Sequence, residues 1–529
     1  IVITTVLQSL YQVAKTHRLV MHDAKPFFRC LLAENLSIPS QVDDIVVMAY
    51  GVQGPSQLSM PGLVANLLQE EMPERDVVLG KGAKRLSFSQ MPVNVIATQL
   101  VAEAGMIEAI WSHISQNVWQ ENEDAERLYR ELDGPLIAIL AAMEIRGALL
   151  DVSLLAQQSA RMTTELSRLT TEAHELAGQE FNPASVKQLQ SILFDQLGLP
   201  IVEKTPKGDP STSEAALTFL AERFPLPKTI LAIRSIAKLK STYIDALPDL
   251  AINDRVHCSF QQTVTATGRL SCQNPNLQNI PVRTEDGRAV RCAFISPDGF
   301  KLVAFDYSQI ELRIMAHISK DPVLTEAFLT GQDIHNATAG ELFSMSPDEV
   351  GDAERRVAKV INFGLIYGMS AFGLSKQLGV DRAMAQAYID RYFQRYPGVK
   401  DYMARIREQA SRDGYVETAL GRKIFLPDIK HNKANIRKAA ERAAINAPMQ
   451  GTAAELIKLA MLEVDAILAK YPGRAHLIIQ VHDELLFEVE SGLVDSLIPR
   501  INQAMTSVLQ LDVPLIVNHK VGDNWGDMS

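Results

Sequence analysis

The sequence has few cysteines and no long apolar segment, and both absences narrow the class of protein. Its four cysteines (Cys30, Cys258, Cys272 and Cys292) are scattered over 529 residues without a C-x-x-C pair. This argues against a structural zinc site or a disulfide framework and fits a reducing cytosol. No apolar run reaches the roughly 20 residues needed to span a bilayer, and no signal peptide opens the chain. We therefore expect a cytoplasmic protein with no membrane partner.

The sequence also lacks tandem repeats, low-complexity linkers and an overall excess of basic residues. Hydrophobic residues make up 47% and charged residues 22%, so the chain can bury a large core in three or four domains. Because residue 1 is Ile and not Met, we expect a fragment or a trimmed chain. The net charge of −10 argues weakly against a nucleic-acid partner, but the distribution of charge matters more than its total.

Basic residues gather in the stretch 422–442, where they outnumber the two acids Asp428 and Glu441. A smaller basic group lies at Arg234, Lys238 and Lys240. Such runs can be solvated helix faces, but beside the motifs described below we expect a track for nucleic-acid phosphates. The basic residues of the main stretch are Arg422, Lys423, Lys430, Lys433, Arg437, Lys438 and Arg442.

Hydrophobic spacing indicates a mixed α/β protein in which helices dominate. Residues 121–176, 309–318 and 433–469 have apolar positions at helical spacing, and residues 255–265 alternate as in a strand. Residues 302–305 form a short apolar run that ends at Asp306, which predicts a buried strand. Residues 476–490 predict a hairpin with His482, Asp483 and Glu484 at its turn.

Asp306 and Asp483 are the first candidate functional residues, because both are predicted to end strands. Phosphoryl transfer from a nucleoside triphosphate can use two metal ions about 3.5–4 Å apart, held by carboxylates from separate parts of a fold. A single aspartate at a strand end can equally form a turn or cap a helix, so neither residue alone decides the question.

A helix predicted around residues 355–367 adds evidence for nucleotide chemistry. Arg355, Lys359, Phe363 and Tyr367 recur every four residues, which places them along one broad helix face. That face displays two cations followed by two aromatic rings, which suit a triphosphate and a stacked base respectively. A buried stripe would not carry Arg and Lys, and a solvated face would not carry Phe and Tyr.

Long motifs in a fixed order resemble those of family A DNA polymerases, in particular the large, Klenow-type fragment of the bacterial polymerase I group. The resemblance extends from about Glu121 to the end of the chain. It implies a right-hand polymerase of thumb, palm and fingers, preceded by a degenerate RNase H-like 3′–5′ exonuclease domain. The expected domains are 1–118 (exonuclease-like), 119–253 (thumb), 254–320 (palm, first part), 321–431 (fingers) and 432–529 (palm, second part). The matching motifs are Thr267–Ser271 with Pro275–Pro281, Asp306–Arg313, Arg355–Gly368 and Gln480–Glu484.

The resemblance implies roles at the reaction centre. Asp306 and Asp483 would hold two Mg²⁺ ions, with Mn²⁺ as a possible substitute, helped by the carbonyl of Tyr307 and supported by Glu484. Lys359 would protonate the departing pyrophosphate. The remaining nucleotide contacts are implied for Arg355 and His335 at the triphosphate, Phe363 stacked beside the nucleotide and discriminating against nucleotides without a 3′-hydroxyl, Glu311 against the 2′ position, Tyr367 at the template position, and Gln309.

The resemblance also implies a primer–template DNA surface. Arg269, Asn446 and Gln450 would read minor-groove acceptors that every correct base pair presents. His482 would touch the primer terminus. Further DNA contacts are implied for Gln278, Asn279, Arg442, Lys238 and Lys240. The expected partners are therefore primer–template DNA and dNTPs, and we expect the protein to act as a monomer.

The N-terminal residues lack the carboxylates that a proofreading exonuclease of this family uses. Phe27 or a neighbouring residue stands where the family has a metal-binding aspartate, and no Tyr–Asp pair accompanies Glu103. We therefore expect an inactive domain kept as a scaffold, as in the Bacillus-type enzymes, and a polymerase that displaces a downstream strand.

Two other functions fit parts of the sequence. A related enzyme could make RNA or copy an RNA template, although Glu311 argues against ribonucleotide use. A catalytically silent DNA-binding protein is the other alternative, and intact Asp306, Lys359 and Asp483 argue against it.

Overall fold

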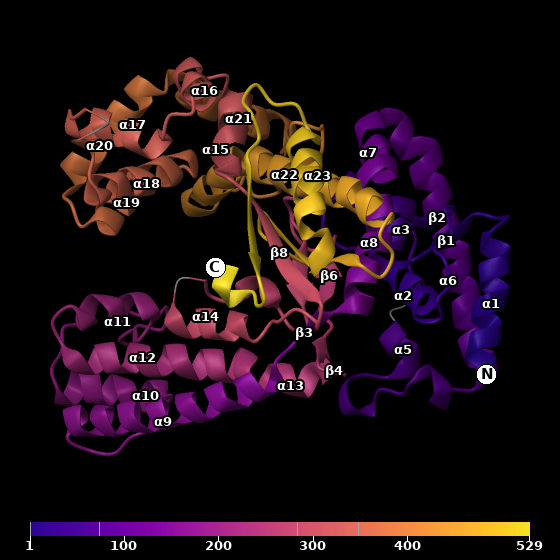
Figure 1. Ribbon diagram of the computed structural model, residues 1–529, viewed down its shortest axis with the longest axis horizontal. Coiled ribbons are helices and arrows are strands. Elements are labelled where there is room, and N and C mark those ends of the chain that lie inside the picture. The colour runs from indigo at the N-terminus through magenta and orange to yellow at the C-terminus, as the bar shows by residue number, and fades with distance from the viewer. Residues whose placement is uncertain (1, 73–74, 283, 347–348, 529) are drawn as a thin grey trace.

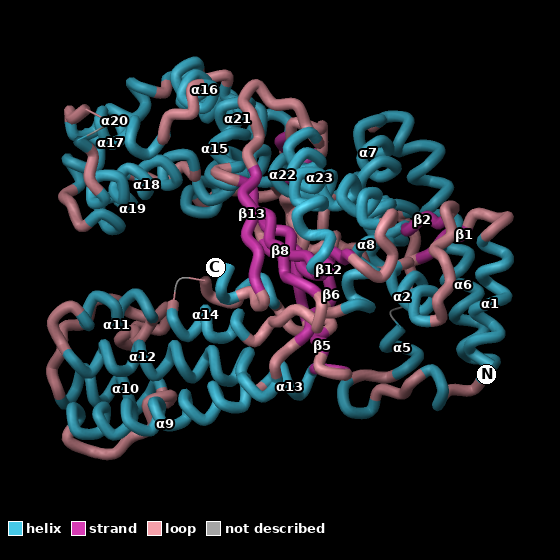
Figure 2. Tube along the Cα trace, in the orientation of Figure 1, coloured by secondary structure: helices cyan, strands magenta, loops and turns pink. Residues whose placement is uncertain are grey.

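The computed structural model describes residues 2–72, 75–282, 284–346 and 349–528. A small antiparallel sheet lies at the centre, with a helical bundle and a second group of helices extending from it on the same side (Figure 1). The N-terminal residues form a further unit on the opposite side (Figure 1). Helices account for most of the described residues (Figure 2), which confirms the predicted mixed α/β class.

The central sheet has four strands in the order β11-β12-β8-β13, and all neighbouring pairs are antiparallel. Its inner side chains are almost wholly buried because β8, β11 and β12 are near-continuous apolar runs. Helices α15, α22 and α23 pack with this sheet in one hydrophobic core. The bounds are β8 Phe300–Tyr307, β11 Ala475–Val481, β12 Glu484–Glu490, β13 Val517–Gly522, α14 Glu285–Cys292, α15 Ile310–Ser319, α22 Ala434–Leu468 and α23 Val494–Ser507.

The predicted hairpin is present, with a turn of two residues. Val481 and Glu484 are the last paired residues of β11 and β12, so His482 and Asp483 form the turn and Glu484 already belongs to a strand. His482 adopts a left-handed backbone conformation, with φ of 54°. Helix α22 also follows the prediction closely, although Pro448 lies within it.

The second group of helices lies between β8 and α22 in sequence and shares the core of the sheet. Aspartates begin three of these helices: Asp321, Asp333 and Asp381 accept hydrogen bonds from backbone amides of the first turn. The bounds are α16 Pro322–Leu329, α17 Ile334–Phe343, α18 Asp352–Ile366, α19 Ala371–Leu378, α20 Arg382–Arg395 and α21 Pro397–Asp413, followed by the hairpin strands β9 Tyr415–Glu417 and β10 Lys423–Phe425.

The helical bundle has a core of its own. Leu169, Leu193, Leu217 and Ile230, from different helices, meet in it and are almost fully buried. Short strands join the bundle to the central sheet region (Figure 1). The bounds are α9 Val152–Ala177, α10 Val186–Gln190, α11 Glu214–Ala221, α12 Pro225–Leu239, α13 Ala246–Leu250, β3 Ala148–Leu149, β4 Ala251–Ile252, β5 Arg255–Val256, β6 Ser259–Gln261 and β7 Ser271–Gln273.

The N-terminal unit contains one parallel pair of strands, β1 and β2, packed among helices. Its core does not end at residue 118, because Trp119, Tyr129 and Ile137 are buried in it. Helix α8 contributes to this core and to the core of the central sheet, so it bridges the two. The bounds are α1 Val2–Ala14, β1 Leu19–Met21, α2 Lys25–Ala33, β2 Val42–Asp44, α3 Ile45–Gln53, α4 Met60–Leu63, α5 Arg75–Leu79, α6 Val93–His113, α7 Glu123–Leu128, the π-helical turn η6 Tyr129–Asp133 and α8 Gly134–Arg146.

One helical segment among the described residues, Val93–Glu121, is long and apolar enough to span a membrane by length and composition, with a mean hydropathy of 1.3. The expectation from the sequence concerned uninterrupted apolar runs, and this segment is interrupted by Glu103 and Glu108. Ile110 and Ile114 of this segment are buried in the N-terminal core, but only 11% of its most apolar stretch is buried in the structure.

Candidate active site

The two candidate carboxylates lie together at one end of the central sheet. Asp306 is the penultimate residue of β8 and pairs across the strands with Glu484 of β12. Asp483 precedes Glu484 in the hairpin turn, and its carbonyl accepts a hydrogen bond from the Tyr307 amide at 3.3 Å. Residues 177 positions apart are thus brought to one place by the register of two strands.

This end of the sheet carries an excess of negative charge. Loss of solvent around the Asp306 carboxyl, together with the charges of Asp483 and Glu484, raises the pKa of Asp306 to about 7. Burial likewise raises the pKa of Asp483 and of Glu484. A divalent cation would relieve this repulsion, and oxygen ligands are those that Mg²⁺ prefers.

The side chain of Glu484 is held in place by Trp525, which in turn packs against Arg291. The Trp525 indole Nε1 donates to its Oε1 at 2.8 Å, and the Arg291 guanidinium lies 4.0 Å from the centre of the Trp525 ring. Glu484 therefore has a fixed orientation beside Asp306, which fits the supporting role implied for it.

A cavity of about 580 Å³ opens between these carboxylates and helix α18. Arg355, Lys359 and Phe363 line it from α18, so three residues of the predicted helix face share this cavity with Asp306 and Asp483. It is also lined by Arg269, Leu270, Gln278, Tyr307, Ser308, Gln309, Ile310, Glu311, His335, Ala453, Ala454, Ile457, Gln480, His482 and Asn518. Twelve of the residues proposed from the sequence therefore share this cavity.

His335 lines the cavity with a side chain that is only 2% exposed. Asn362 lies behind it: its Oδ1 accepts from Thr338 Oγ1 at 3.0 Å, which turns its amide nitrogen toward His335 Nδ1 at 3.0 Å. In this arrangement Nδ1 accepts, so Nε2 carries the ring proton. Burial, with Arg355 and Lys359 nearby, lowers the pKa of His335 to about 4 against the opposing charge of Asp333.

Arg355 is paired with Asp333, whose Oδ2 accepts from Arg355 Nη2 at 2.8 Å and from Nε at 3.1 Å. The other oxygen of Asp333 caps α17 by accepting from the amides of His335 and Asn336. Asp333 thus holds two cavity-lining residues in place at once.

A second polar cluster surrounds Glu311. Its carboxylate accepts from Arg269 Nη2 at 2.5 Å and from the Tyr367 hydroxyl. Tyr367 ends α18, and its carbonyl accepts from Asn446 Nδ2 of α22 at 3.4 Å. Glu311 therefore ties three elements together beside the cavity. Tyr367 and Asn446 do not line the cavity itself.

The remaining DNA-contact candidates lie outside the cavity. Asn279, Arg442 and Lys238 are exposed, and Gln450 is half-buried on α22. The Lys240 ammonium is held by Asp245 at 2.7 Å and by Ser159, and its contact with DNA stays a prediction. Glu484, the residue implied to support the metal ligands, does not line the cavity either.

Arg422 corrects the prediction of a continuous phosphate track along 422–442. Its side chain is 4% exposed and pairs with Asp133 and Glu455, so it cannot meet a phosphate. Lys430, Lys433, Lys438 and Arg442 are exposed.

The motifs overlooked Asn362 and Asn518. Asn518 lies opposite Asp306 in β13 and lines the cavity. No local pattern marks it, since its position is set only by strand pairing. Asn362 belonged to a matched motif but was passed over because it falls off the exposed face of α18.

In the N-terminal unit, Glu103 is paired with Arg75 at 2.6 Å and accepts from Gln99. Phe27 packs in the apolar core. Asp44 caps α3, and Asp43 binds Arg18 and Arg130. No group of three or more His, Cys, Asp or Glu side chains placed to hold a metal ion occurs in residues 2–72, 75–282, 284–346 and 349–528. At the end of the central sheet, the carboxylates of Asp306 and Asp483 form a pair and not a group of three.

Several known proteins are similar in sequence to this chain over most of its length. Residues 152–527 match the family described as DNA polymerase family A. DNA polymerase I of Pseudomonas aeruginosa is 51% identical over 457 residues, which are 85% of this chain and 50% of the relative. The thermostable DNA polymerase I of Thermus aquaticus is 46% identical over 429 residues, 80% of this chain and 51% of the relative. DNA polymerase I of Geobacillus stearothermophilus is 40% identical over 517 residues, which are 97% of this chain and 58% of the relative.

A solved structure agrees with these relatives. The POL domain of Pol1 from M. smegmatis, in complex with DNA primer-template and dNTP, has a TM-score of 0.85 and 36% identity, covering 96% of this chain and 85% of that chain. Because the family match covers well over half of the sequence, the chain belongs to the family A DNA polymerases. Enzymes of this family depend on divalent metal ions. The chain spans about half the length of the curated relatives it matches.

Proposed function

We propose that this chain adds deoxynucleotides to the 3′-hydroxyl of a DNA primer under the direction of a DNA template, with release of pyrophosphate. The observation that carries the proposal is the shared cavity of about 580 Å³, with Asp306 and Asp483 on one side and Arg355, Lys359 and Phe363 on the other. Carboxylates for metal ions thus face cations for a triphosphate across a space that can hold a nucleotide.

The metal requirement of the family is assigned here to two Mg²⁺ ions, with Mn²⁺ as a substitute. Asp306, Asp483 and the carbonyl of Tyr307 would hold them, with Glu484 in support. The raised pKa of the Asp306 carboxyl fits this role, because its partners supply negative charge and a cation is what the group lacks. When bound, such ions acidify the primer hydroxyl and neutralise charge on the phosphates.

The chain's own side chains would orient the nucleotide. Arg355 would bind the triphosphate, either after leaving Asp333 or while still paired with it. His335 would donate a hydrogen bond from its Nε2–H to a phosphate oxygen. The Lys359 ammonium would protonate the departing pyrophosphate. Phe363 would stack beside the sugar and base, and Glu311 would exclude a 2′-hydroxyl by steric conflict.

Primer–template DNA would lie against Arg269, Gln278, Asn279, Asn446, Gln450 and His482, with Arg442, Lys238 and Lys240 on its phosphates. The protein would act as a monomer in the bacterial cytosol, in replication and repair. Proofreading would be absent, because Phe27 is apolar and the Glu103 carboxylate is occupied by Arg75. Nothing in this chain would cleave a downstream strand, so strand displacement is expected.

The test is extension of an end-labelled primer with Mg²⁺ and dNTPs, beside an Asp483→Asn variant that keeps the size of the side chain. Full-length product that disappears in the variant is the expected result. A lane without nucleotides tests proofreading, since a shortened primer would mean that the N-terminal unit cuts DNA. Efficient extension with rNTPs would favour an RNA polymerase. No extension, with primer–template binding retained, would leave a DNA-binding protein without catalysis.

A further inference from the structure

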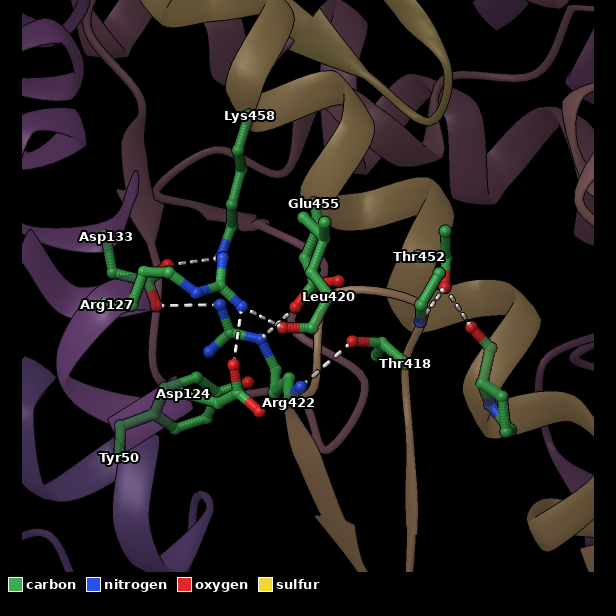
Figure 3. A network of polar contacts seen from close by, with 12 residues as sticks. Tyr50, Asp124, Arg127, Asp133, Thr418, Leu420, Arg422, Thr452, Glu455 and Lys458 are labelled. Atoms are coloured by element: carbon green, nitrogen blue, oxygen red, sulfur yellow. Dashed lines mark hydrogen bonds and ion pairs between the residues drawn. The ribbon is translucent and has the colours of Figure 1, made fainter. Parts of the chain in front are cut away.

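Four charged side chains form a network in the interior (Figure 3), and none of them lines the candidate active-site cavity. Arg422 donates through Nη2 to Asp133 Oδ2 and through Nε to Glu455 Oε1, both at 2.8 Å. Lys458 Nζ donates to Asp133 Oδ1 at 2.9 Å. All four side chains are at most 4% exposed, and their formal charges cancel.

Burying four charges costs solvation, so stability alone does not explain the network. Apolar residues of similar volume are often at least as stable as a buried ion pair. Within the described residues, Arg422 Nη1 and Glu455 Oε2 also lack hydrogen-bond partners although both atoms are buried. What an ion pair adds over apolar packing is a defined geometry between the elements that it joins.

The elements joined are far apart in sequence. Asp133 ends the π-helical turn η6 and belongs to the N-terminal unit, Arg422 precedes β10 in a hairpin, and Glu455 and Lys458 lie on α22 (Figure 3). The hairpin turn is held at further points: Arg127 Nη2 donates to the Leu420 carbonyl at 2.7 Å.

The same hairpin is tied to α22 beside its proline. Thr452 Oγ1 accepts from the Ala419 amide at 2.9 Å and donates to the Pro448 carbonyl at 2.7 Å. Pro448 lies between Asn446 and Gln450, the two α22 residues implied to read the minor groove. The network therefore continues directly into the part of α22 that carries them.

Arg422 also packs against the loop that carries Arg269. A side-chain carbon added at Gly268 would lie 3.5 Å from Arg422 Nε, and Gly268 has a φ of 82°. On the other side, Tyr50 of α3 places its ring 5.9 Å from the Arg422 guanidinium and donates its hydroxyl to the Thr265 carbonyl at 2.8 Å. The loop 265–269 is thus held between the N-terminal unit and Arg422.

We propose that Asp133, Arg422, Glu455 and Lys458, together with Tyr50, are positioning residues that let the N-terminal unit hold loop 265–269 and the middle of α22 in register for reading the primer terminus. The inference rests on the proposed polymerase function and extends it. The N-terminal unit thereby has a function in the polymerase: through this network it determines how strongly a matched primer end is preferred over a mispaired one.

The test compares extension of a primer whose last base pair is matched with one whose last pair is mismatched. In Arg422→Leu/Glu455→Leu both ion pairs of Arg422, with Glu455 and with Asp133, are removed, the overall charge is kept, and the Lys458–Asp133 pair remains. Its ratio of matched to mismatched extension is expected to fall roughly tenfold or more, while KM for the correct dNTP changes by less than about twofold. The control is Arg255→Leu/Glu488→Leu, because it removes another ion pair, of 2.9 Å, with a buried glutamate and a partly buried arginine toward the far end of β12. That control should keep the wild-type ratio.

Tyr50→Phe covers the case in which the double variant does not fold. It removes only the hydroxyl that binds Thr265 and is expected to lower the same ratio with an unchanged melting temperature. A wild-type ratio in Tyr50→Phe, or in a folded Arg422→Leu/Glu455→Leu, would overturn the proposal. Fluorescence anisotropy of labelled matched and mismatched primer–template, without dNTPs, measures the preference independently of catalysis. If the wild type extends nothing, the polymerase proposal fails, and a binding preference lost in the variants would still support the positioning role.

Discussion

His335 is expected to make the stability of this protein depend on pH in a window that begins near pH 6.5, above the usual range of carboxyl groups. Its pKa is about 4 in the fold against 6.5 for an ordinary histidine, because its side chain is buried beside Arg355 and Lys359. As pH falls below 6.5, the unfolded chain takes up a proton at this residue and the folded chain does not. The folded state therefore loses stability progressively from pH 6.5 down to 4, and keeps it fully above pH 6.5.

The size of this effect follows from the two pKa values. Between pH 8 and pH 5 the difference in proton binding at His335 alone removes about 2 kcal/mol from the free energy of unfolding. The whole shift corresponds to about 3 kcal/mol, reached near pH 4. His335→Gln removes the titrating group and keeps a polar side chain against Asn362, so its stability should fall by about 2 kcal/mol less over the same interval.

The assay is chemical denaturation of wild type and His335→Gln at pH 8 and pH 5, followed by circular dichroism. Taking the difference between the two proteins cancels the other titrating groups. His476→Gln serves as a matched control, because the pKa of His476 is also lowered to about 4 by burial, beside Arg146. It should reduce the pH dependence by a similar amount while leaving nucleotide binding intact. Equal pH dependence in wild type and His335→Gln, or an NMR titration of His335 near 6.5, would refute the reasoning.

Three further outcomes are expected. Phe363→Tyr should raise incorporation of dideoxynucleotides relative to dNTPs by roughly tenfold or more, since the added hydroxyl can replace the missing 3′ hydrogen bond; competitive incorporation on a sequencing gel measures this. Glu311→Ala should raise rNTP incorporation by about tenfold or more and release the Tyr367 hydroxyl, and unchanged rNTP exclusion in single-turnover assays would contradict the steric role. Gly451→Ala should lower the free energy of unfolding by about 1 kcal/mol or more, because the new methyl group would lie 2.5 Å from Thr418 Cγ2. Thermal unfolding measures this loss. Gly178→Ala is the control with open space around the new methyl group, where only the positive φ adds strain.

Local pattern was sufficient to predict several elements that build the candidate site. The apolar run before Asp306, the hairpin around Asp483 and the helix through residues 433–469 are present as β8, β11–β12 and α22. Each is set by hydrophobic spacing within the segment, which a single sequence displays. The face of α18 was predictable for the same reason, and three of its four named residues line the cavity.

The features that the sequence alone did not reveal depend on distant partners. Arg422 resembled the other basic residues of its stretch, but its ion pair with Asp133 joins positions 289 apart. The core of the N-terminal unit extends past residue 118 because Trp119 and Tyr129 pack back into it. Asn518 reaches the cavity through the register of β13 against β8. No local pattern records such pairings, so they require the fold.

The contrast between Asp306 and Asp133 separates the two polar sites of this protein by charge balance. Burial raises the pKa of an aspartate in both places, but at Asp133 the charges of Arg422 and Lys458 outweigh it and bring the pKa to about 2. At Asp306 the neighbours Asp483 and Glu484 add to the effect, and the pKa rises to about 7. The charges of the Asp133 network are balanced within the chain, so the network holds its elements in place without binding an ion. The Asp306 cluster is left with uncompensated negative charge, which is the condition under which a site gains from binding cations and the phosphates they accompany.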